Sequence, residues 1–184
     1  EVDRLNRIVV DFLFAVRPVD VQPERSDINQ IIRELMEFLR YEVKEHGVET
    51  EANLADDLPD LDLDEKFVKQ ALMNLVKNSL AAMPDGGRLI FSTERRGDEV
   101  LLRMSDTGEG ISEENLGKIF EPYFTTKDFG SGIGLTLVYK VVKEHKGEIS
   151  VVSHPDEGTT FSILFPIPQR EQHLLSWSGE EREV

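Results

Sequence analysis

The most constraining stretch of the sequence is residues 88–106, "RLIFSTERRGDEVLLRMSD", in which two apolar-rich segments flank Arg96-Gly97-Asp98. Strand-forming residues on both sides of a short turn that contains glycine are typical of a β-hairpin. A second hairpin is predicted within residues 147–167, across "PDEG". Hairpins join neighbouring antiparallel strands, so the sequence excludes a sheet made only of repeated parallel βαβ units.

Between the predicted strands lie segments with helical periodicity. Asp27 is suited to cap the first of them, and Gly47 to end it. A strand is predicted over "VETEANLA", and a short helical piece interrupts the loop from Thr107 to Ser131. The predicted helices are Asp27–His46, Asp64–Met83 and Ile133–Lys146, with the short piece at Glu113–Ile119. This order indicates an α+β sandwich: a mixed sheet with three helices on one face.

The two ends of the chain differ from this central part. Residues 1–17 carry an apolar stripe of helical spacing that stops before Pro18, and the stripe needs a partner. We expect another helix, from another segment or another copy of the chain; a helix packed back on its own domain is the alternative. Residues 18–26 are interpreted as a linker, 27–168 as one domain, and 169–184 as a flexible tail.

Net charge limits the partners. The formal net charge of −15 argues against nucleic acid and against anionic membrane surfaces. A phosphate ligand would need local backbone N–H groups, a few cations or a metal ion. Eight carboxylates between Glu49 and Glu65, without Lys or Arg, are interpreted as a solvated edge rather than a metal site, because hard-ion loops need fixed ligand spacing.

Several types of site are excluded by composition. The chain has no cysteine, which excludes disulfides and thiolate chemistry, and its four histidines form no His-x-x-x-His pair. No apolar run approaches the roughly 18 residues of a membrane span. We expect a cytoplasmic piece, in a protein that is membrane-anchored or not.

Asn74 and Asn78 are four positions apart on the second long helix, away from its apolar side. Asparagine costs several tenths of a kcal/mol relative to alanine inside a helix. The two residues are either exposed asparagines without a function or carboxamides facing a hard cation such as Mg²⁺, whose other ligands are phosphates and water.

"MSDTGEGI" directly follows a predicted strand and supplies Asp106, Gly108 and Gly110. A carboxylate at a strand end can accept a hydrogen bond from an amino group, and glycines allow the backbone to approach a planar ligand. Taken alone, an aspartate followed by glycines is also common in ordinary turns.

"KIFEPYFTTK" gathers Phe120, Tyr123 and Phe124 without a regular period. These rings form either a small satellite core or the anchors of a mobile lid from which Lys127 reaches phosphate.

"GSGIGL", from Gly130 to Leu135, precedes the third helix. Its spacing is that of neither a Rossmann fingerprint nor a P-loop. An anion site at a helix N-terminus is the remaining prediction, because free N–H groups and the helix dipole favour phosphate there.

Five motifs in this order resemble one known family. "NLVKNSLAAM", "DTGEGI", "FEPYFTTK", "GSGIGLTLVYKVVKEHKGEI" and "GTTFSILFP" are similar to the N box, first glycine box, F box, second glycine box and closing Gly-Thr of the sensor histidine kinase catalytic domain. That domain has the Bergerat ATP-binding fold of gyrase, MutL-type and heat-shock-protein ATPases. Residues 1–17 resemble the end of the dimerisation and phosphoacceptor domain. Lys146 and Ile133 depart from the family pattern, which commonly has glycine and leucine there.

The resemblance implies specific roles. Asn78 would hold Mg²⁺ together with the ATP phosphates, Asp106 would accept from the adenine amino group beside Thr159, and Lys127 would hold the phosphate tail. The remaining implied ATP-binding residues are Asn74, Gly108, Gly110, Ile111, Phe120, Gly130, Gly132, Gly134 and Leu135.

The resemblance also implies transfer of the ATP γ-phosphoryl group to a histidine and onward to a response regulator, in a homodimer. None of His46, His145, His154 and His173 has the sequence context of the family's acceptor, so the acceptor is expected outside these residues, on the dimerisation domain. The alternatives are an ATPase that uses water and a nucleotide-sensing module. Asn74 stands where related ATPases carry a glutamate base, which argues against hydrolysis.

Overall fold

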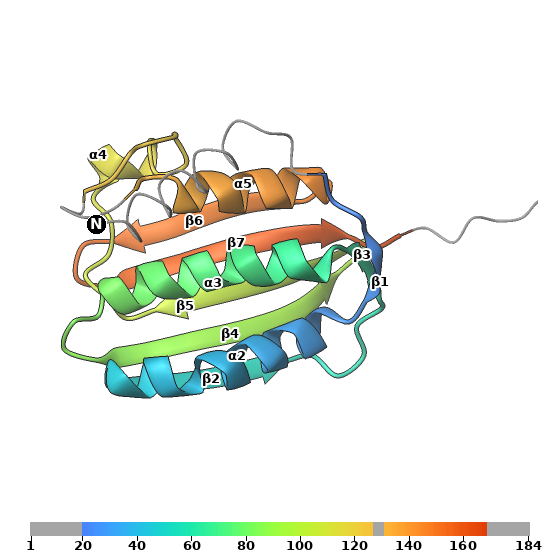
Figure 1. Ribbon diagram of the computed structural model, residues 1–184, viewed down its shortest axis with the longest axis horizontal. Helices are drawn as coiled ribbons and strands as arrows, with labels where there is room; N and C mark the ends of the chain where they lie inside the picture. Colours follow the sequence, from blue (N-terminus) through green and yellow to red (C-terminus); the bar gives the residue numbers. More distant parts are fainter. Residues whose placement is uncertain (1–19, 127–130, 169–184) are drawn as a thin grey trace, which may run out of the picture.

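The computed structural model describes residues 20–126 and 131–168. Its main sheet has the strand order β2-β4-β5-β7-β6, in which only β2 and β4 are parallel. Helices α2, α3 and α5 lie side by side over one face of this sheet (Figure 1). The strands of the sheet are β2 (Val48–Leu54), β4 (Gly87–Arg96), β5 (Glu99–Asp106), β6 (Glu148–His154) and β7 (Gly158–Pro166); the helices are α2 (Ile28–Glu45), α3 (Glu65–Ala81), α4 (Glu113–Leu116) and α5 (Gly134–Glu144).

The two long helices begin where the sequence predicts. The carboxylate of Asp27 accepts from the backbone N of Asn29 at 2.8 Å, and that of Asp64 accepts from the N of Phe67 at 3.3 Å. Both bonds satisfy N–H groups that have no partner inside the helix. Gly47, with φ of 66°, follows the end of α2, in the conformation that glycine adopts at low cost.

The core lies between the helices and the sheet. Phe91, Met104 and Phe161 are direct register partners on three neighbouring strands, and each is at most 3% exposed. Burial of such side chains stabilises the fold by about 1.5–3 kcal/mol each. The helices contribute Ile31, Leu35, Leu39, Val68, Leu72, Leu75, Val138 and Val141 to the same core. The sheet is thereby fixed in register beneath the helices.

The α+β prediction is confirmed: the sheet is mixed and mostly antiparallel, with helices on one face. Both predicted hairpins are present. The short helix α4 ends at Leu116 rather than at Ile119, and the third helix runs from Gly134 to Glu144, inside its predicted bounds. No helix in the described part of the chain is long and apolar enough to cross a membrane.

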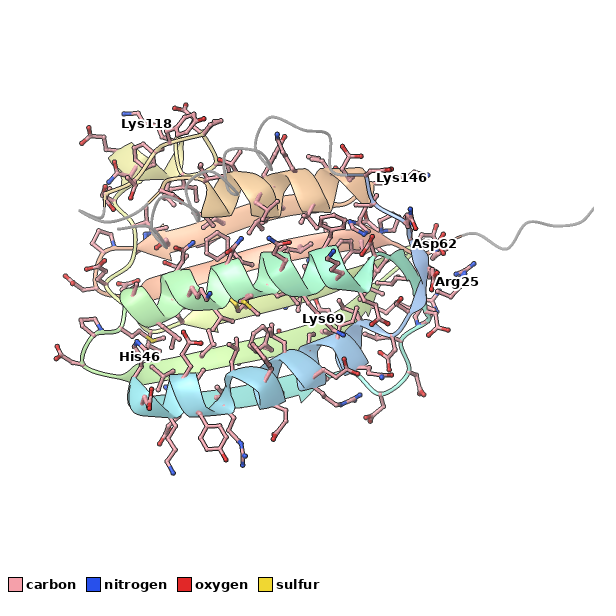
Figure 2. All side chains as sticks on the ribbon, viewed as in Figure 1. Arg25, His46, Asp62, Lys69, Lys118 and Lys146 are labelled. Carbon is pink, nitrogen blue, oxygen red and sulfur yellow. The ribbon has the colours of Figure 1, made fainter. Side chains whose placement is uncertain are left out.

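A small second sheet was not predicted. β1 (Glu24–Ser26) pairs antiparallel with β3 (Leu61–Leu63), so part of the predicted linker 18–26 is a strand. Arg25 Nε lies 3.2 Å from Asp62 Oδ1 across the pair, and both residues are labelled at this end of the molecule in Figure 2. A strand of three residues is too short for its alternation of apolar and polar side chains to be recognised in the sequence. The predicted helix 1–17 and tail 169–184 lie outside the described residues.

Candidate functional site

Asp106 is the last residue of β5 and is only 7% exposed. Its Oδ1 accepts from the backbone N of Gly108 at 3.0 Å and of Thr159 at 3.1 Å. Its Oδ2 accepts from Ser79 Oγ on α3 at 2.5 Å. The carboxylate is therefore held from three directions by neutral donors, and it makes no ion pair among the residues that the structure describes.

The carboxylate of Asp106 can accept one further hydrogen bond. An ionised carboxylate has roughly four lone-pair positions, two on each oxygen. Both positions on Oδ1 are taken, and one on Oδ2 is taken by Ser79. One position remains, on Oδ2, and only a donor such as an amino group satisfies it.

The glycines next to Asp106 are required by close backbone contacts. A Cβ on Gly108 would lie 2.7 Å from the carbonyl oxygen of Ala82, at the end of α3. Gly110 has φ of 71°, and a Cβ there would lie 2.0 Å from the carbonyl oxygen of His154. These glycines fit the loop tightly between α3 and the β6–β7 turn, so protein packing alone accounts for both of them.

Asn74 and Asn78 are half-buried on α3, whereas their neighbours Leu75 and Ser79 are buried. Neither carboxamide hydrogen-bonds to another residue in the described part of the chain. A Cβ on Gly134 would lie 3.8 Å from Asn74 Cγ, so the first residue of α5 faces Asn74. The carboxamide of Asn74 thus lies near the start of a second helix, and that of Asn78 lies one turn further along α3.

The start of α5 has no side-chain cap. Ile133 occupies the N-cap position, and its aliphatic side chain cannot accept from the first-turn N–H groups. Free N–H groups at a helix N-terminus attract anions. Leu135, in this first turn, is partly buried and packs against the core. The α5 end thus supplies donors, while Asn74 beside it offers a carboxamide.

The loop before α5 is closed at its base. The backbone N of Tyr123 donates to the carbonyl oxygen of Gly132 at 3.0 Å. Gly132 has φ of 67°, and a Cβ there would lie 2.4 Å from the carbonyl carbon of Tyr123. Tyr123 also has a positive φ, 66°, which is uncommon for a residue with a side chain. Lys127 and Gly130 of the predicted lid lie outside the described residues.

The aromatic segment is partly core. Phe120 and Phe124 pack against the main hydrophobic cluster, and the Phe120 ring centroid lies 5.7 Å from that of Tyr139 on α5. Thr136 Oγ1 donates to the carbonyl oxygen of Phe120 at 3.2 Å. The segment is therefore fastened to α5 just after the uncapped N-terminus.

Two serines of the site were missed by sequence reasoning. Ser153 Oγ accepts from the backbone N of Ile111 at 2.8 Å and lies 2.9 Å from Thr159 Oγ1. Ser79 is 1% exposed and bonds Asp106. In the sequence, Ser79 could have been recognised as a functional candidate because it is a hydroxyl residue on an otherwise apolar face of the helix, next to Asn78.

In the described part of the chain, carboxylate and imidazole groups do not form a metal site. Within residues 20–126 and 131–168, no three His, Cys, Asp or Glu side chains are grouped so as to hold a metal ion. The amide oxygens of Asn74 and Asn78 are the donors present at the site, and these suit Mg²⁺ when phosphate oxygens complete its coordination.

Comparison with known proteins identifies similar chains. Residues 63–169 match the protein family described as histidine kinase-, DNA gyrase B-, and HSP90-like ATPase. Sporulation kinase E of Bacillus subtilis (strain 168) is 34% identical over 94% of the chain, and sensor histidine kinase ZraS of Escherichia coli (strain K12) is 32% identical over 91%. The chain spans only 23% and 36% of the lengths of these two proteins.

Solved structures agree on the fold. Full-length ShkA in complex with AMPPNP superposes with a TM-score of 0.82 at 23% identity, over 91% of this chain and 36% of that one. The catalytic domain of the histidine kinase ThkA gives 0.73 at 27% identity, over 80% of this chain and 99% of that domain. ThkA in complex with the response regulator TrrA gives 0.77 at 25% identity, over 91% and 48%.

Proposed function

The chain belongs to the family of histidine kinase-, DNA gyrase B- and HSP90-like ATPases, and on that premise we propose that it binds Mg·ATP and phosphorylates a histidine as the catalytic domain of a two-component sensor kinase. The acceptor histidine lies on the dimerisation domain, and a response regulator aspartate receives the group next.

The observation that carries the proposal is the buried carboxylate of Asp106 with one unfilled acceptor position. The amino group of adenine donates to Oδ2, with Thr159, Gly108, Gly110 and Ile111 near the base. A buried acceptor left without a donor costs about 1–3 kcal/mol, so this position favours an amino-bearing ligand strongly over one that lacks the group.

The phosphates lie at the other end of the site. The uncapped N-terminus of α5 at Gly134 would supply N–H donors, and Asn78 would hold Mg²⁺ together with phosphate oxygens, with Asn74 lining the same space. The family resemblance assigns Lys127 and the backbone near Gly130 and Gly132 to the phosphate tail, which they would hold. The bound metal would neutralise phosphate charge during transfer.

The chemistry needs little from the chain beyond positioning. An imidazole nitrogen of the acceptor attacks the γ-phosphorus, the bond from that phosphorus to the bridging oxygen breaks, and ADP leaves with the electron pair. The proton of the attacking imidazole passes to solvent. The residues of this chain bind and orient ATP, and the nucleophile comes from the dimerisation domain.

Hydrolysis of ATP by water is not favoured. Asn74 lies four residues before Asn78, where related ATPases carry a glutamate base. A carboxamide cannot take a proton from water. The site therefore retains ATP for a nucleophile supplied by another domain.

Support for the two partners comes from relatives. ThkA, whose structure is similar to this chain, has been crystallised in complex with a response regulator. The phosphoacceptor domain belongs to the same protein, and the intact protein is a homodimer that works in the cytoplasm.

A transfer assay tests the proposal. The chain is incubated with Mg²⁺ and ATP labelled at the γ-phosphate, alone and with the dimerisation domain of its own protein. We expect no label on the chain itself and acid-labile, alkali-stable label on the added domain. Replacement of the acceptor histidine of that domain by alanine is the control and should remove the label. Strong labelling of the chain alone, or release of phosphate without transfer, would contradict the proposal.

A further inference from the structure

Ser79 stands out because its hydroxyl lies on the buried face of α3. The residue is 1% exposed, and its neighbours on that face are aliphatic. Serine inside a helix ordinarily bonds back to the carbonyl four residues earlier. Here Ser79 Oγ instead donates to Asp106 Oδ2, 27 residues along the chain, at 2.5 Å. The bond joins α3 to the end of β5 inside the site.

Ser79 donates to the same oxygen of Asp106 that the adenine amino group would use. Because both positions on Oδ1 are filled by the backbone of Gly108 and Thr159, the remaining position lies on Oδ2, the oxygen that Ser79 holds. The hydroxyl of Ser79 has one proton, and this bond uses it. Neither Asp106 nor Ser79 can then donate to a ligand oxygen.

We propose that Ser79 is a positioning residue that makes this end of the pocket a pure acceptor, and thereby selects a 6-amino purine over a 6-oxo purine. The inference rests on the proposed nucleotide site. An amino group at position 6 donates to Oδ2, whereas an oxygen at position 6 would face a carboxylate with no proton between them. Rejection by unpaired buried polar groups is the strongest form of discrimination that a binding site has.

Removal of the hydroxyl should relax this selection. In Ser79→Ala a water can take the vacated place, and a water has two protons. One proton can go to Asp106 and the other to a 6-oxo group, which then becomes tolerable. Alanine is also the better helix former, so α3 should persist.

The test compares ATP with inosine triphosphate, its 6-oxo analogue, by calorimetry in the presence of Mg²⁺. We expect the wild-type chain to prefer ATP by about 100-fold or more, and Ser79→Ala to reduce this ratio by about tenfold. Ser79→Cys, which retains a weaker donor in a somewhat larger side chain, should give an intermediate ratio.

Ser26→Ala is the matched control. Ser26 is also a buried serine, 5% exposed, but its hydroxyl donates to the carbonyl oxygens of Glu24 and Leu63 in the small sheet. Its loss should leave the ratio of the two affinities unchanged. Circular dichroism and thermal unfolding check the fold of each variant.

Different results would contradict the proposed function and the role of Ser79. A wild-type chain that binds neither nucleotide contradicts the proposed function and this inference together. A wild-type preference for ATP that Ser79→Ala keeps within twofold, including a proportional loss of both affinities, overturns the inference alone and leaves the proposed function in place.

Discussion

In the proposed function, Asp106 is the residue on which nucleotide binding would depend most. Its side chain accepts three hydrogen bonds and has room for one more. The sequence predicted that this carboxylate ends a strand, and the structure places it at the end of β5, whereas its role in binding adenine stays a prediction. The sequence did not predict Ser79 or Ser153, because their hydroxyls meet their partners only when helices, strands and loops distant in sequence are brought together.

Asp106→Asn should abolish measurable ATP binding, with a loss of about 100-fold or more. An amide places N–H groups where Ser79, Thr159 or the adenine amino group must donate, and each mismatched buried bond costs about 1–3 kcal/mol. Calorimetry measures the affinity. Asp98→Asn, in the exposed β4–β5 turn, is the control and should bind as the wild type does. Unchanged affinity in Asp106→Asn would refute the adenine assignment.

Asn78→Ala should weaken binding of Mg·ATP by about tenfold while changing metal-free ATP binding by less than about twofold, because the carboxamide oxygen is assigned to the metal. Parallel titrations with Mg²⁺ and with a chelator separate the two affinities. Asn53→Ala, an exposed asparagine on β2 that bonds Glu51, provides the comparison. Equal losses under both conditions would assign Asn78 to the nucleotide rather than to the metal.

At the scale of elements, the N-termini of the two long helices were the most predictable features. Asp27 and Asp64 cap α2 and α3 as their sequence positions indicate. The pairing of β1 with β3 was not predictable, because each strand has three residues and register partners such as Arg25 and Asp62 lie far apart in the sequence. Local signals set where helices begin, whereas strand pairing across the chain depends on the assembled core.

Ion pairs contribute less to helix arrangement than packing does. Lys69, labelled in Figure 2, lies on α3 with its Nζ 2.6 Å from Glu34 Oε2 on α2. This hydrogen bond is the main cause that lowers the pKa of Glu34. A depressed carboxyl pKa stabilises the fold above the unfolded pKa of about 4.3, and the effect is lost as pH falls through the folded value. Exposed pairs of this kind are worth little.

His145 should be the polar residue that links α5 to α3 most strongly. It is 5% exposed, and its Nε2 accepts from the backbone N of Asp64 at 2.8 Å. In the neutral ring the proton is therefore on Nδ1, which donates to the carbonyl oxygen of Val141 at 2.7 Å. His145→Ala leaves the Asp64 N–H unpaired and opens a cavity beside Phe165. We expect a loss of about 2–4 kcal/mol in the free energy of unfolding.

Denaturant unfolding measures this loss. His46→Ala is the matched control: His46 is exposed at the end of α2, where Figure 2 labels it, and its removal should cost less than about 0.5 kcal/mol. If both variants unfold at the same denaturant concentration, the link between α5 and α3 does not contribute to stability.

At the scale of the whole molecule, the sheet positions the two ends of one site. Asp106 ends β5 beneath the end of α3, while Asn74 on the same helix faces the start of α5. In the proposed function, a chain with a net charge of −15 would bind a polyphosphate through local N–H groups, carboxamides and a metal ion. The resemblance predicted this arrangement from five short motifs, and the fold it implied is confirmed.

The most direct test is a crystal structure of the wild-type chain with Mg²⁺ and AMPPNP. The account predicts the adenine amino nitrogen about 2.7–3.2 Å from Asp106 Oδ2, the phosphates at the N-terminus of α5, and Mg²⁺ on the oxygen of Asn78. Adenine bound away from Asp106, or phosphates distant from α5, would contradict it.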